Sequence, residues 1–481
     1  MTGKGKSRWA DSEEDAAREA ALKKQKELKK RLKKEREAAA AAQKAQIQAQ
    51  KLSRQAERND DDHDDADDLD GQRPTKRRRL TPEPNATGQN DSNVTGGSST
   101  STTRLLRFQG NGFGKSRSVE NYDKLNDIEE GAYGWVARAK EIATGKVVAL
   151  KRLKIEANDR NGLPVTGLRE IQILKECEHR NIVRLQEVVV GEDTAKIENI
   201  FLVLEFLEHD LKSILEDMPQ PFLTSEVKTL LLQLASGVAY LHDNWILHRD
   251  LKTSNLLLNN RGQLKIADFG MARFVGDPPP HTLTQLVVTL WYRSPELLLG
   301  TASYGEAVDM WSVGCIFGEL LTREPLLQGR NEVDELTKIF ELCGIPTEES
   351  WPGFRRLPNA RSLRLPPGKA NTGSVIRAKF PFLTGAGAAL LNDLLSLDPS
   401  KRPSAREMLS HEYFRQDPRP KSEAMFPTFP SKAGQERRRR RDTPNAPGRG
   451  EAVDLGTVDF SGIFNGREKE ERGGGFSLRM V

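Results

Sequence analysis

Cysteine is scarce in this chain, and its three residues, Cys177, Cys315 and Cys343, stand far apart without the short spacing of a metal site. Three scattered thiols also give no disulfide framework of the kind that stabilises small secreted proteins. Long apolar runs are missing too: none reaches the length that spans a bilayer, and the first residues are not an export signal. These absences predict a protein of a reducing compartment inside the cell.

Apolar residues are too few for a chain of 481 residues packed throughout, because the mean hydropathy is −0.62. The shortfall lies at the two ends. Residues 11–57 are mostly Ala, Glu, Lys, Arg and Gln and contain no Pro or Gly. Residues 1–57 are therefore predicted to form a charged helical extension. Leu22, Leu28 and Leu32 do not sustain a heptad repeat, which favours a solvated helix over a coiled coil.

Residues 58–118 form a linker of biased composition, in which an aspartate-rich run precedes the basic cluster Lys76–Arg79 and a Ser/Thr/Gly/Asn-rich stretch. Such sequence buries too little apolar surface to offset ordering entropy, so disorder is expected here and in most of residues 415–481. The second basic cluster, Arg437–Arg441, lies in that C-terminal extension. Both clusters suit nuclear import through importin or contact with RNA-associated assemblies, and the alternative is a solvated charge run without a partner. The net charge of +5 is small, so the folded part is not expected to bind nucleic acid.

The central part of the chain carries the motifs HRDLKTSN and DFG, which supply the groups that phosphoryl transfer requires. Asp250 would accept the proton of a hydroxyl nucleophile, and Lys252 would contact the moving phosphoryl group. Asn255 and Asp268 would hold Mg²⁺ against the phosphates of ATP. Either motif alone could be a loop turn that matches by chance. Their order and separation together indicate the catalytic region of a protein kinase.

A glycine turn and a strand with a terminal lysine lie upstream, in the order a kinase requires. Gly131 and Gly134 have no Cβ, so the backbone there can close over phosphates. Glu129 stands at the place of the usual first glycine, and a plain β-hairpin explains the turn equally well. Lys151 ends a predicted buried strand, where lysine is usually a solvated edge residue. Its expected partner is Glu170, and their ion pair would aim the ammonium group at the α and β phosphates.

Residues 122–414 resemble the cyclin-dependent kinases. The segment Pro164–Glu170, PVTGLRE, is similar to the helix that names the PITSLRE type, and departs from it at Val165 and Gly167. These departures leave the related PISSLRE type open. The sequences KTSN, CIFGELLT, MFPTFPSK and the terminal GFSL also resemble the PITSLRE subfamily.

The resemblance implies an α+β, two-lobed protein kinase fold, with a small β-sheet N-lobe (about 119–206) that carries one regulatory helix and a larger helical C-lobe (about 207–414). Three residues have structural roles in such kinases. Glu296, in Ser-Pro-Glu, is expected to pair with Arg402, and Asp309 is expected to brace the backbone of the catalytic loop.

The nucleotide site follows from the same resemblance. The apolar run 202–207 is predicted to enter the hinge between the lobes, where the Glu205 carbonyl and the Leu207 backbone would hold the adenine edge. Four apolar side chains that would cover the faces of the adenine, and that also suit a core, are Ile128, Val136, Ala149 and Leu257.

A phosphate clamp is the third implied feature. It would consist of Arg169, Arg249 and Arg273, converging on a phosphothreonine that orders the activation segment. Thr284 matches that threonine, although Thr282 and Thr289 are near it in sequence, and the alternative is an ordinary exposed threonine.

Three further positions bear on regulation and substrate choice. Thr289 is implied to contact the catalytic loop, and Val288 to shape a pocket that favours proline after the target residue. Tyr133 is the one member of a paired inhibitory phosphosite that survives, because Ala132 replaces the other.

The predicted function is a serine/threonine kinase that uses ATP and Mg²⁺, with a cyclin, of L type by resemblance, docked on the Pro164–Glu170 helix. Its substrates would be nuclear Ser/Thr-Pro proteins of transcription, pre-mRNA processing or cell-cycle control, and its location nuclear, with the cytoplasm as a further site. Two alternatives remain open. One is a pseudokinase or scaffold, and the other is a nucleic-acid-associated adaptor that uses the charged extensions.

Overall fold

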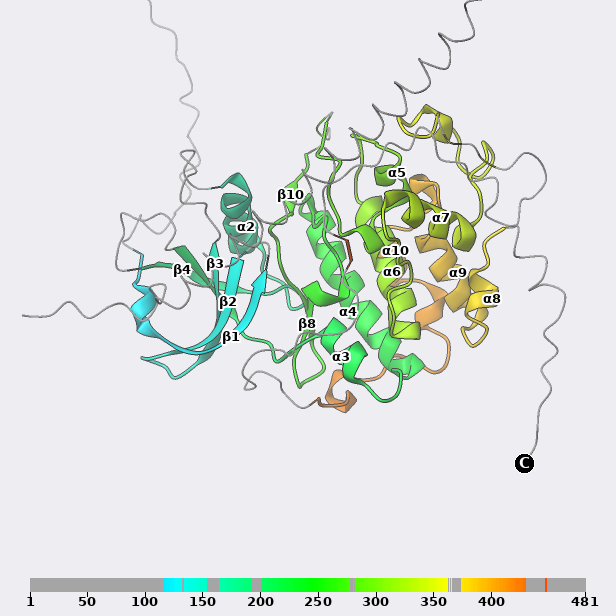
Figure 1. Ribbon diagram of the computed structural model, residues 1–481. Helices are drawn as coiled ribbons and strands as arrows, with labels where there is room; N and C mark the ends of the chain where they lie inside the picture. The colour runs from blue at the N-terminus through cyan, green and yellow to red at the C-terminus, as the bar shows by residue number, and fades with distance from the viewer. Residues whose placement is uncertain are drawn as a thin grey trace, which may run out of the picture. The chain divides into compact units, whose positions relative to one another are not determined.

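A five-stranded antiparallel sheet forms the N-lobe of the described part of the chain, in the order β1-β2-β3-β5-β4 (Figure 1). The computed structural model describes residues 116–131, 134–153, 164–191, 200–276, 280, 282–361, 363, 365, 373–429 and 446–447. The predicted helical extension 1–57, nearly all of the linker 58–118, Tyr133, and most of the C-terminal extension with Arg437–Arg441 lie outside these residues.

The sheet strands are β1 (Tyr122–Gly131), β2 (Gly134–Glu141), β3 (Val147–Leu153), β4 (Leu185–Val190) and β5 (Ile200–Glu205). The residues of β3 alternate largely between buried and partly buried positions, as the period of a strand requires. A small apolar core backs the sheet, with Val148 and Leu150 of β3 packed against Phe201 and Val203 of β5. Helix α2 (Val165–Glu176) also belongs to the N-lobe.

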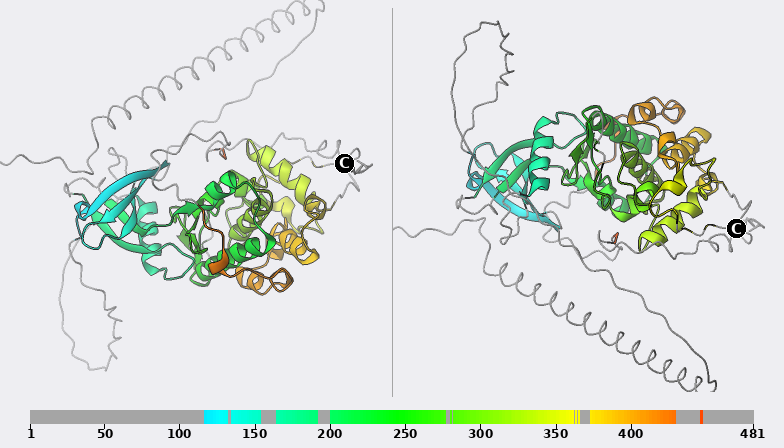
Figure 2. Two further views of the ribbon diagram at one scale, coloured as in Figure 1. Left: turned by 90° about the horizontal axis from the view of Figure 1, so that it is seen from below. Right: turned by 90° about the horizontal axis from the view of Figure 1, so that it is seen from above.

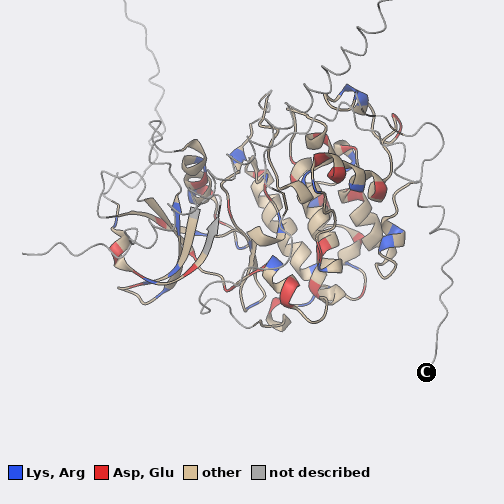
Figure 3. Ribbon diagram, in the orientation of Figure 1, with Lys and Arg blue, Asp and Glu red and all other residues tan. Residues whose placement is uncertain are grey.

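The C-lobe is mainly helical, and Figure 2 shows from two further sides that its helices lie apart from the N-lobe sheet. Its helices are α3 (Leu211–Asp217), α4 (Thr224–Asp243), α5 (Pro295–Leu298), α6 (Ala307–Thr322), α7 (Glu332–Cys343), α8 (Ile376–Lys379), α9 (Gly385–Leu394) and α10 (Ala405–Leu409). Helices α4 and α6 are mostly uncharged (Figure 3), and nearly all of α6 is buried, as expected for a helix that is apolar all round. No described helix is both long and apolar enough to cross a membrane.

Short strands and 3-10 turns complete the described elements, and the first 3-10 turn precedes β1 in the N-lobe. The strands are β6 (His209–Asp210), β7 (Ile246–Leu247), β8 (Leu256–Leu258), β9 (Leu264–Ile266) and β10 (Arg273–Phe274). The 3-10 turns are η1 (Val119–Asn121), η2 (Thr253–Asn255), η3 (Leu290–Tyr292), η4 (Phe354–Arg356), η5 (Pro399–Lys401), η6 (Glu412–Phe414) and η7 (Glu423–Met425). Strands β6, β8 and β9 form one sheet, and β7 pairs with β10.

Ordered packing continues past the predicted domain end at residue 414. Residues 415–429, which we call the C-terminal strap, run back over α4. Lys421 forms an ion pair with Glu226 (3.0 Å), and Glu423 forms one with Arg180 (2.7 Å). Phe426 is buried against the loop that precedes β9. Gly262 there has φ +77°, and a Cβ at that position would lie 2.6 Å from both Glu423 O and Phe426 Cβ, so glycine is required.

Candidate active site

The catalytic loop between β7 and β8 brings Asp250 and Lys252 together with Thr289 of the activation segment. Asp250 is 1 % exposed. Its Oδ1 accepts hydrogen bonds from the backbone N–H of Thr289 (3.1 Å) and from the Thr289 hydroxyl (2.8 Å). Lys252 Nζ donates to Asp250 Oδ2 (3.0 Å) and to Thr289 Oγ1 (3.2 Å). A carboxylate, an ammonium group and a hydroxyl therefore meet at one point, and the contact expected between Thr289 and the catalytic loop is present.

The loop is braced from below by Asp309, near the start of α6. Its two carboxylate oxygens accept the backbone N–H groups of His248 (2.9 Å) and Arg249 (2.9 Å), and Oδ2 also lies 3.0 Å from His242 Nε2. Burial alone would raise the pKa of Asp309, but His242 and the loop N–H groups outweigh it and lower this pKa. The ionised carboxylate thereby holds Arg249 in the left-handed region, at φ 62°. The bracing predicted for Asp309 is thus present.

Lys151 of β3 joins the two lobes electrostatically. Its Nζ lies 2.6 Å from Glu170 Oε1 on α2 and 2.8 Å from Asp268 Oδ1 of the DFG motif. Burial would lower the pKa of Lys151, but the two carboxylates raise it above its ordinary value. Burial likewise opposes ionisation of Asp268, yet Lys151 holds its pKa below the usual range. The expected Lys151–Glu170 pair is present, and Asp268 joins it as a charged group.

Asn255 and Asp268 provide oxygens that fit Mg²⁺, a hard cation that keeps few protein ligands beside substrate phosphates. The amide nitrogen of Asn255 donates to the backbone carbonyl of Asp250 (2.8 Å), so the amide oxygen is the atom left for a cation. Asp268 has φ 62°, an uncommon conformation for a residue other than glycine, and such strain persists where the surroundings enforce it. The donor set therefore suits the metal that the motifs predict.

The residues expected around the adenine come from both lobes. Leu207 lies two residues beyond the end of β5 and is buried, whereas Glu205 is only partly buried. The Glu205 carboxylate is tied to Lys265 (2.8 Å), which fixes the end of β5. The four predicted face-covering residues lie on β1, β2, β3 and β8, and each keeps part of its surface exposed: Ile128, Val136, Ala149 and Leu257.

The predicted glycine turn joins β1 to β2. Gly131 pairs with Gly134 at the end of the ladder, so the backbone does reverse there as a hairpin. The residues between them lie outside the described part of the chain, and the prediction of Tyr133 as a phosphosite stays a prediction.

The three clamp arginines influence one another electrostatically. Burial is the main cause that lowers the pKa of Arg169, and the neighbouring charges of Arg273 and Arg249 lower it further. A strong anion such as a phosphate would relieve this repulsion among the three cations, as the predicted clamp requires. Thr284 is exposed, and its carbonyl accepts a hydrogen bond (2.6 Å) from the Tyr304 hydroxyl, which in turn accepts one (3.0 Å) from Arg249 Nη1. The predicted phosphothreonine position thus lies one side chain away from the clamp.

The backbone next to Thr289 is held in an unusual conformation. Val288 has φ 63°, which is costly for a β-branched residue. Its N–H donates to the Arg249 carbonyl (3.0 Å), and its carbonyl accepts from Arg293 Nε (3.3 Å) and Nη2 (3.0 Å). Arg293 also pairs with Glu332 (2.7 Å). The Val288 carbonyl is therefore occupied by a guanidinium group.

Tyr304 and Arg293 were not predicted from the sequence. Neither belongs to a short motif with a known spacing, and each acts on a residue at least five positions away through contacts that exist only in the folded chain. The predicted structural pair Glu296–Arg402 is present as a buried bidentate ion pair, with Nη1–Oε1 at 2.6 Å and Nη2–Oε2 at 2.7 Å.

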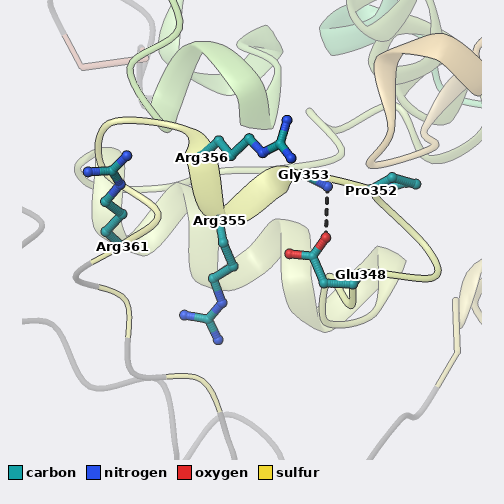
Figure 4. A pocket seen from close by; sticks show the side chains of 6 residues that line it. All are labelled: Glu348, Pro352, Gly353, Arg355, Arg356 and Arg361. Atoms are coloured by element: carbon teal, nitrogen blue, oxygen red, sulfur yellow. Dashed lines mark hydrogen bonds between the residues drawn. The ribbon is translucent and has the colours of Figure 1, made fainter.

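A separate shallow cavity of about 500 Å³ lies on the C-lobe around η4 (Figure 4). Arg355, Arg356 and Arg361 line it together with Glu348, whose carboxylate accepts the backbone N–H of Gly353 (2.8 Å). The three guanidinium groups point in different directions in Figure 4 and do not converge on one point. None of the predicted site residues lines this cavity.

Comparisons with known proteins agree with this geometry. The protein kinase domain family matches residues 122–414. The chain is 54% identical over 316 residues to the serine/threonine-protein kinase ppk23 of Schizosaccharomyces pombe, a match that covers 66% of this chain and 78% of that protein. It is 50% identical to cyclin-dependent kinase 11B of Rattus norvegicus, covering 69% of this chain and 74% of the rat protein.

Other relatives are longer. Cyclin-dependent kinase G-1 of Oryza sativa subsp. indica is 53% identical over 67% of this chain, and the match spans about half of that relative, 46% of its length. From the matched domain and these identities, the chain belongs to the protein kinase family and, within it, to the cyclin-dependent serine/threonine kinases of the PITSLRE type.

Proposed function

We propose that the chain transfers the γ-phosphate of ATP to a serine or threonine that is followed by proline, when a cyclin is bound. The observation that carries this proposal is the position of Lys151 Nζ, which lies within 2.8 Å of both Glu170 and Asp268. This arrangement joins the regulatory helix, the phosphate-binding lysine and a metal ligand, and protein kinases need all three in place. Mg²⁺ bound to Asn255 and Asp268 would neutralise charge on the phosphates.

Asp250 and Lys252 would act on the two reacting groups. The Asp250 carboxylate would orient the substrate hydroxyl and accept its proton. The Lys252 ammonium group, fixed 3.0 Å from that carboxylate, would offset the negative charge on the phosphoryl group as it moves. Because the transition state needs little covalent help, these residues contribute mainly by positioning and by charge.

The preference for proline follows from Val288. An ordinary residue after the target would bring a backbone N–H into this part of the substrate groove, and the nearby Val288 carbonyl already accepts from Arg293. Proline has no N–H, so it loses nothing there, whereas any other residue would leave a donor unpaired.

The proposed cyclin surface is the outer face of α2. Val165 and Leu168 are 58 % and 48 % exposed, and three-residue spacing places them on the same side of the helix. Glu170, on the same helix, is buried and paired with Lys151. A partner that presses on Val165 and Leu168 would therefore set the position of a catalytic ion pair. Relatives named cyclin-dependent kinases support a cyclin as this partner, and the PVTGLRE sequence favours the L type.

Phosphorylation of Thr284 would complete the active state. A phosphate there adds nearly two negative charges, which Arg169, Arg249 and Arg273 would neutralise, ordering the activation segment.

The direct test measures ATP turnover and phosphorylation of a Ser-Pro peptide by the full chain co-purified with its cyclin, with Asp250→Ala as the matched control. We expect wild type to exceed the variant by at least about a thousandfold. Equal, background phosphorylation by both proteins would overturn the kinase proposal and favour a scaffold. Mass spectrometry of the same material would identify the cyclin and report whether Thr284 is modified.

We also propose that the kinase acts in the nucleus on proteins of transcription, pre-mRNA processing or the cell cycle, and that its basic clusters engage importin or RNA-associated assemblies. The runs of Lys and Arg at residues 76–79 and 437–441 support this proposal. Loss of nuclear fluorescence after both runs are changed to alanine would support import. Salt-dependent RNA binding that survives deletion of residues 119–414 would instead support the RNA contact.

A further inference from the structure

A buried carboxyl group lies directly beneath the catalytic loop and takes no part in the chemistry described above. Glu319 of α6 is 2 % exposed. Its Oε1 lies 2.7 Å from Thr253 Oγ1, and its Oε2 lies 2.6 Å from the Tyr292 hydroxyl. The two hydroxyls are themselves 3.2 Å apart. The three side chains therefore form a closed triangle of oxygen contacts.

The triangle joins two segments that have to be aligned for phosphoryl transfer. Thr253 is fully buried and stands between Lys252 and Asn255 in the catalytic loop. Tyr292 ends the turn that follows Thr289, in the segment next to the proposed proline pocket. Glu319 belongs to α6, the same helix that braces the loop through Asp309. One buried group thus anchors the catalytic loop and the substrate-facing segment to a single rigid helix.

Hydrogen counting shows that only the protonated carboxyl group can close all three contacts of the triangle with hydrogen bonds. With Glu319 ionised, only two hydroxyl hydrogens are present for three contacts, and both point at the carboxylate, leaving Thr253 and Tyr292 without a hydrogen between them. With Glu319 protonated, three hydrogens serve three contacts. The carboxyl donates from Oε2 to Tyr292, Tyr292 donates to Thr253, and Thr253 donates to Oε1. Every group then donates once and accepts once.

We propose that Glu319, Thr253 and Tyr292 form a proton-sharing ring that aligns the catalytic loop with the segment receiving the substrate, and that Glu319 is a positioning residue for phosphoryl transfer. This inference rests on the proposed kinase activity. It assigns to the ring no contact with substrate or nucleotide.

The electrostatics of the site place the ring's proton near neutral pH. Burial raises the pKa of Glu319 to about 7, while the two hydroxyl donors and Lys212 of α3 oppose the shift and Glu216 of α3 adds to it. Tyr292 remains protonated, since burial and Glu319 raise the pKa of its hydroxyl. As pH rises through about 7, the ring loses its third hydrogen and the contact between Thr253 and Tyr292 weakens.

The first test compares Glu319→Gln with wild type, using the full chain with its cyclin. The amide has the shape of the protonated acid and can donate once and accept once, so the ring stays closed at every pH. We expect the ratio of kcat of the variant to kcat of wild type to rise several-fold as pH increases from about 6 to about 8. Taking the ratio cancels titrations that both proteins share. A ratio that is constant with pH would overturn the proposal.

The second test separates positioning from stability. Thr253→Val removes one ring hydroxyl, Thr253→Ser retains it, and Thr229→Val is the matched control. Thr229 is a buried threonine of α4 whose hydroxyl lies 2.9 Å from the Ser225 carbonyl and 2.7 Å from the Lys421 carbonyl. We expect Thr253→Val to lower kcat about tenfold, the serine variant to restore it, and Thr229→Val to lower only the melting temperature.

Equal kcat losses in the two valine variants, or no rescue by serine, would refute a positioning role. If Thr253→Val does not fold, the proposal is decided by the first test alone, that is, by how the ratio of kcat of Glu319→Gln to kcat of wild type changes with pH. Failure of the kinase proposal would look different, since wild type itself would then show no phosphorylation above the Asp250→Ala background.

Discussion

Replacing Arg293 by methionine should relax the requirement for proline after the target residue. In wild type, the guanidinium group holds the Val288 carbonyl through contacts of 3.0 and 3.3 Å. Charge-assisted hydrogen bonds of this kind contribute about 1.5–3 kcal/mol each. The left-handed conformation of Val288 costs about 1–2 kcal/mol, so these bonds are sufficient to maintain it. Without them, Val288 would return to negative φ and its carbonyl would become available.

The size of the effect follows from the unpaired donor. A buried N–H without an acceptor costs about 1–3 kcal/mol, which corresponds to a preference of roughly 5- to 150-fold for proline over alanine in kcat/KM. In Arg293→Met this ratio should fall below about fivefold, because the substrate N–H can now find the Val288 carbonyl. The assay compares two peptides that differ only in proline or alanine after the phosphorylated serine.

Glu332→Gln is the matched control for this change. It removes the carboxylate that lies 2.7 Å from Arg293 Nη1 but leaves the contacts with Val288 intact. This variant should keep the wild-type ratio. The reasoning fails if Arg293→Met, folded by its melting curve, discriminates between the peptides as strongly as wild type does.

Three further outcomes are expected. Lys151→Met should lower kcat/KM by at least about 100-fold in the turnover assay, because Asp268 loses the ammonium group that holds its carboxylate in place. Activity near that of wild type would contradict this role of Lys151. Thr284→Ala should lose most cyclin-dependent activity at unchanged melting temperature, whereas Thr282→Ala should not, and phosphopeptide mapping checks which residue is modified. Burial raises the pKa of Glu335 from 4.5 to about 8, so the folded state binds an extra proton in that window and stability falls as pH rises through it. Glu335→Gln should therefore show a smaller loss of unfolding free energy from about pH 5 to 8. The unfolding free energy is measured by urea titration at each pH, and a pH dependence equal to that of wild type would refute the assignment.

The parts of the site that the sequence predicted are those set by local motifs. Asp250, Lys252 and Asn255 lie within six residues, so the turn that holds them fixes their mutual distances. The Lys151–Glu170 pair spans only nineteen positions, between one strand and the next helix. Spacing alone does not show that the two charges meet, and the pair is expected because the motifs stand in the order of a protein kinase.

The unpredicted parts depend on distant contacts with no pattern of their own. The Glu319 ring requires α6 to pass under the catalytic loop. In the sequence, nothing distinguishes Thr253 from the other residues of that loop. The sequence predicts disorder for most of residues 415–481 from their biased composition. Phe426 nevertheless finds a site next to Gly262, more than 160 positions earlier, and a glycine in a turn gives no sign of what will cover it.

The strap also determines where this domain can be cut. Lys228 of α4 has no exposed surface, and its ammonium group donates to the backbone carbonyls of Gln416 (2.7 Å) and Pro418 (2.8 Å) while lying 4.6 Å from the centre of the Tyr413 ring. A fragment ending at residue 414, where the family match stops, would retain this cation and lose both of its acceptors. An expressed catalytic domain therefore has to extend to Phe429 if its longest helix is to keep the surroundings it has in the whole chain.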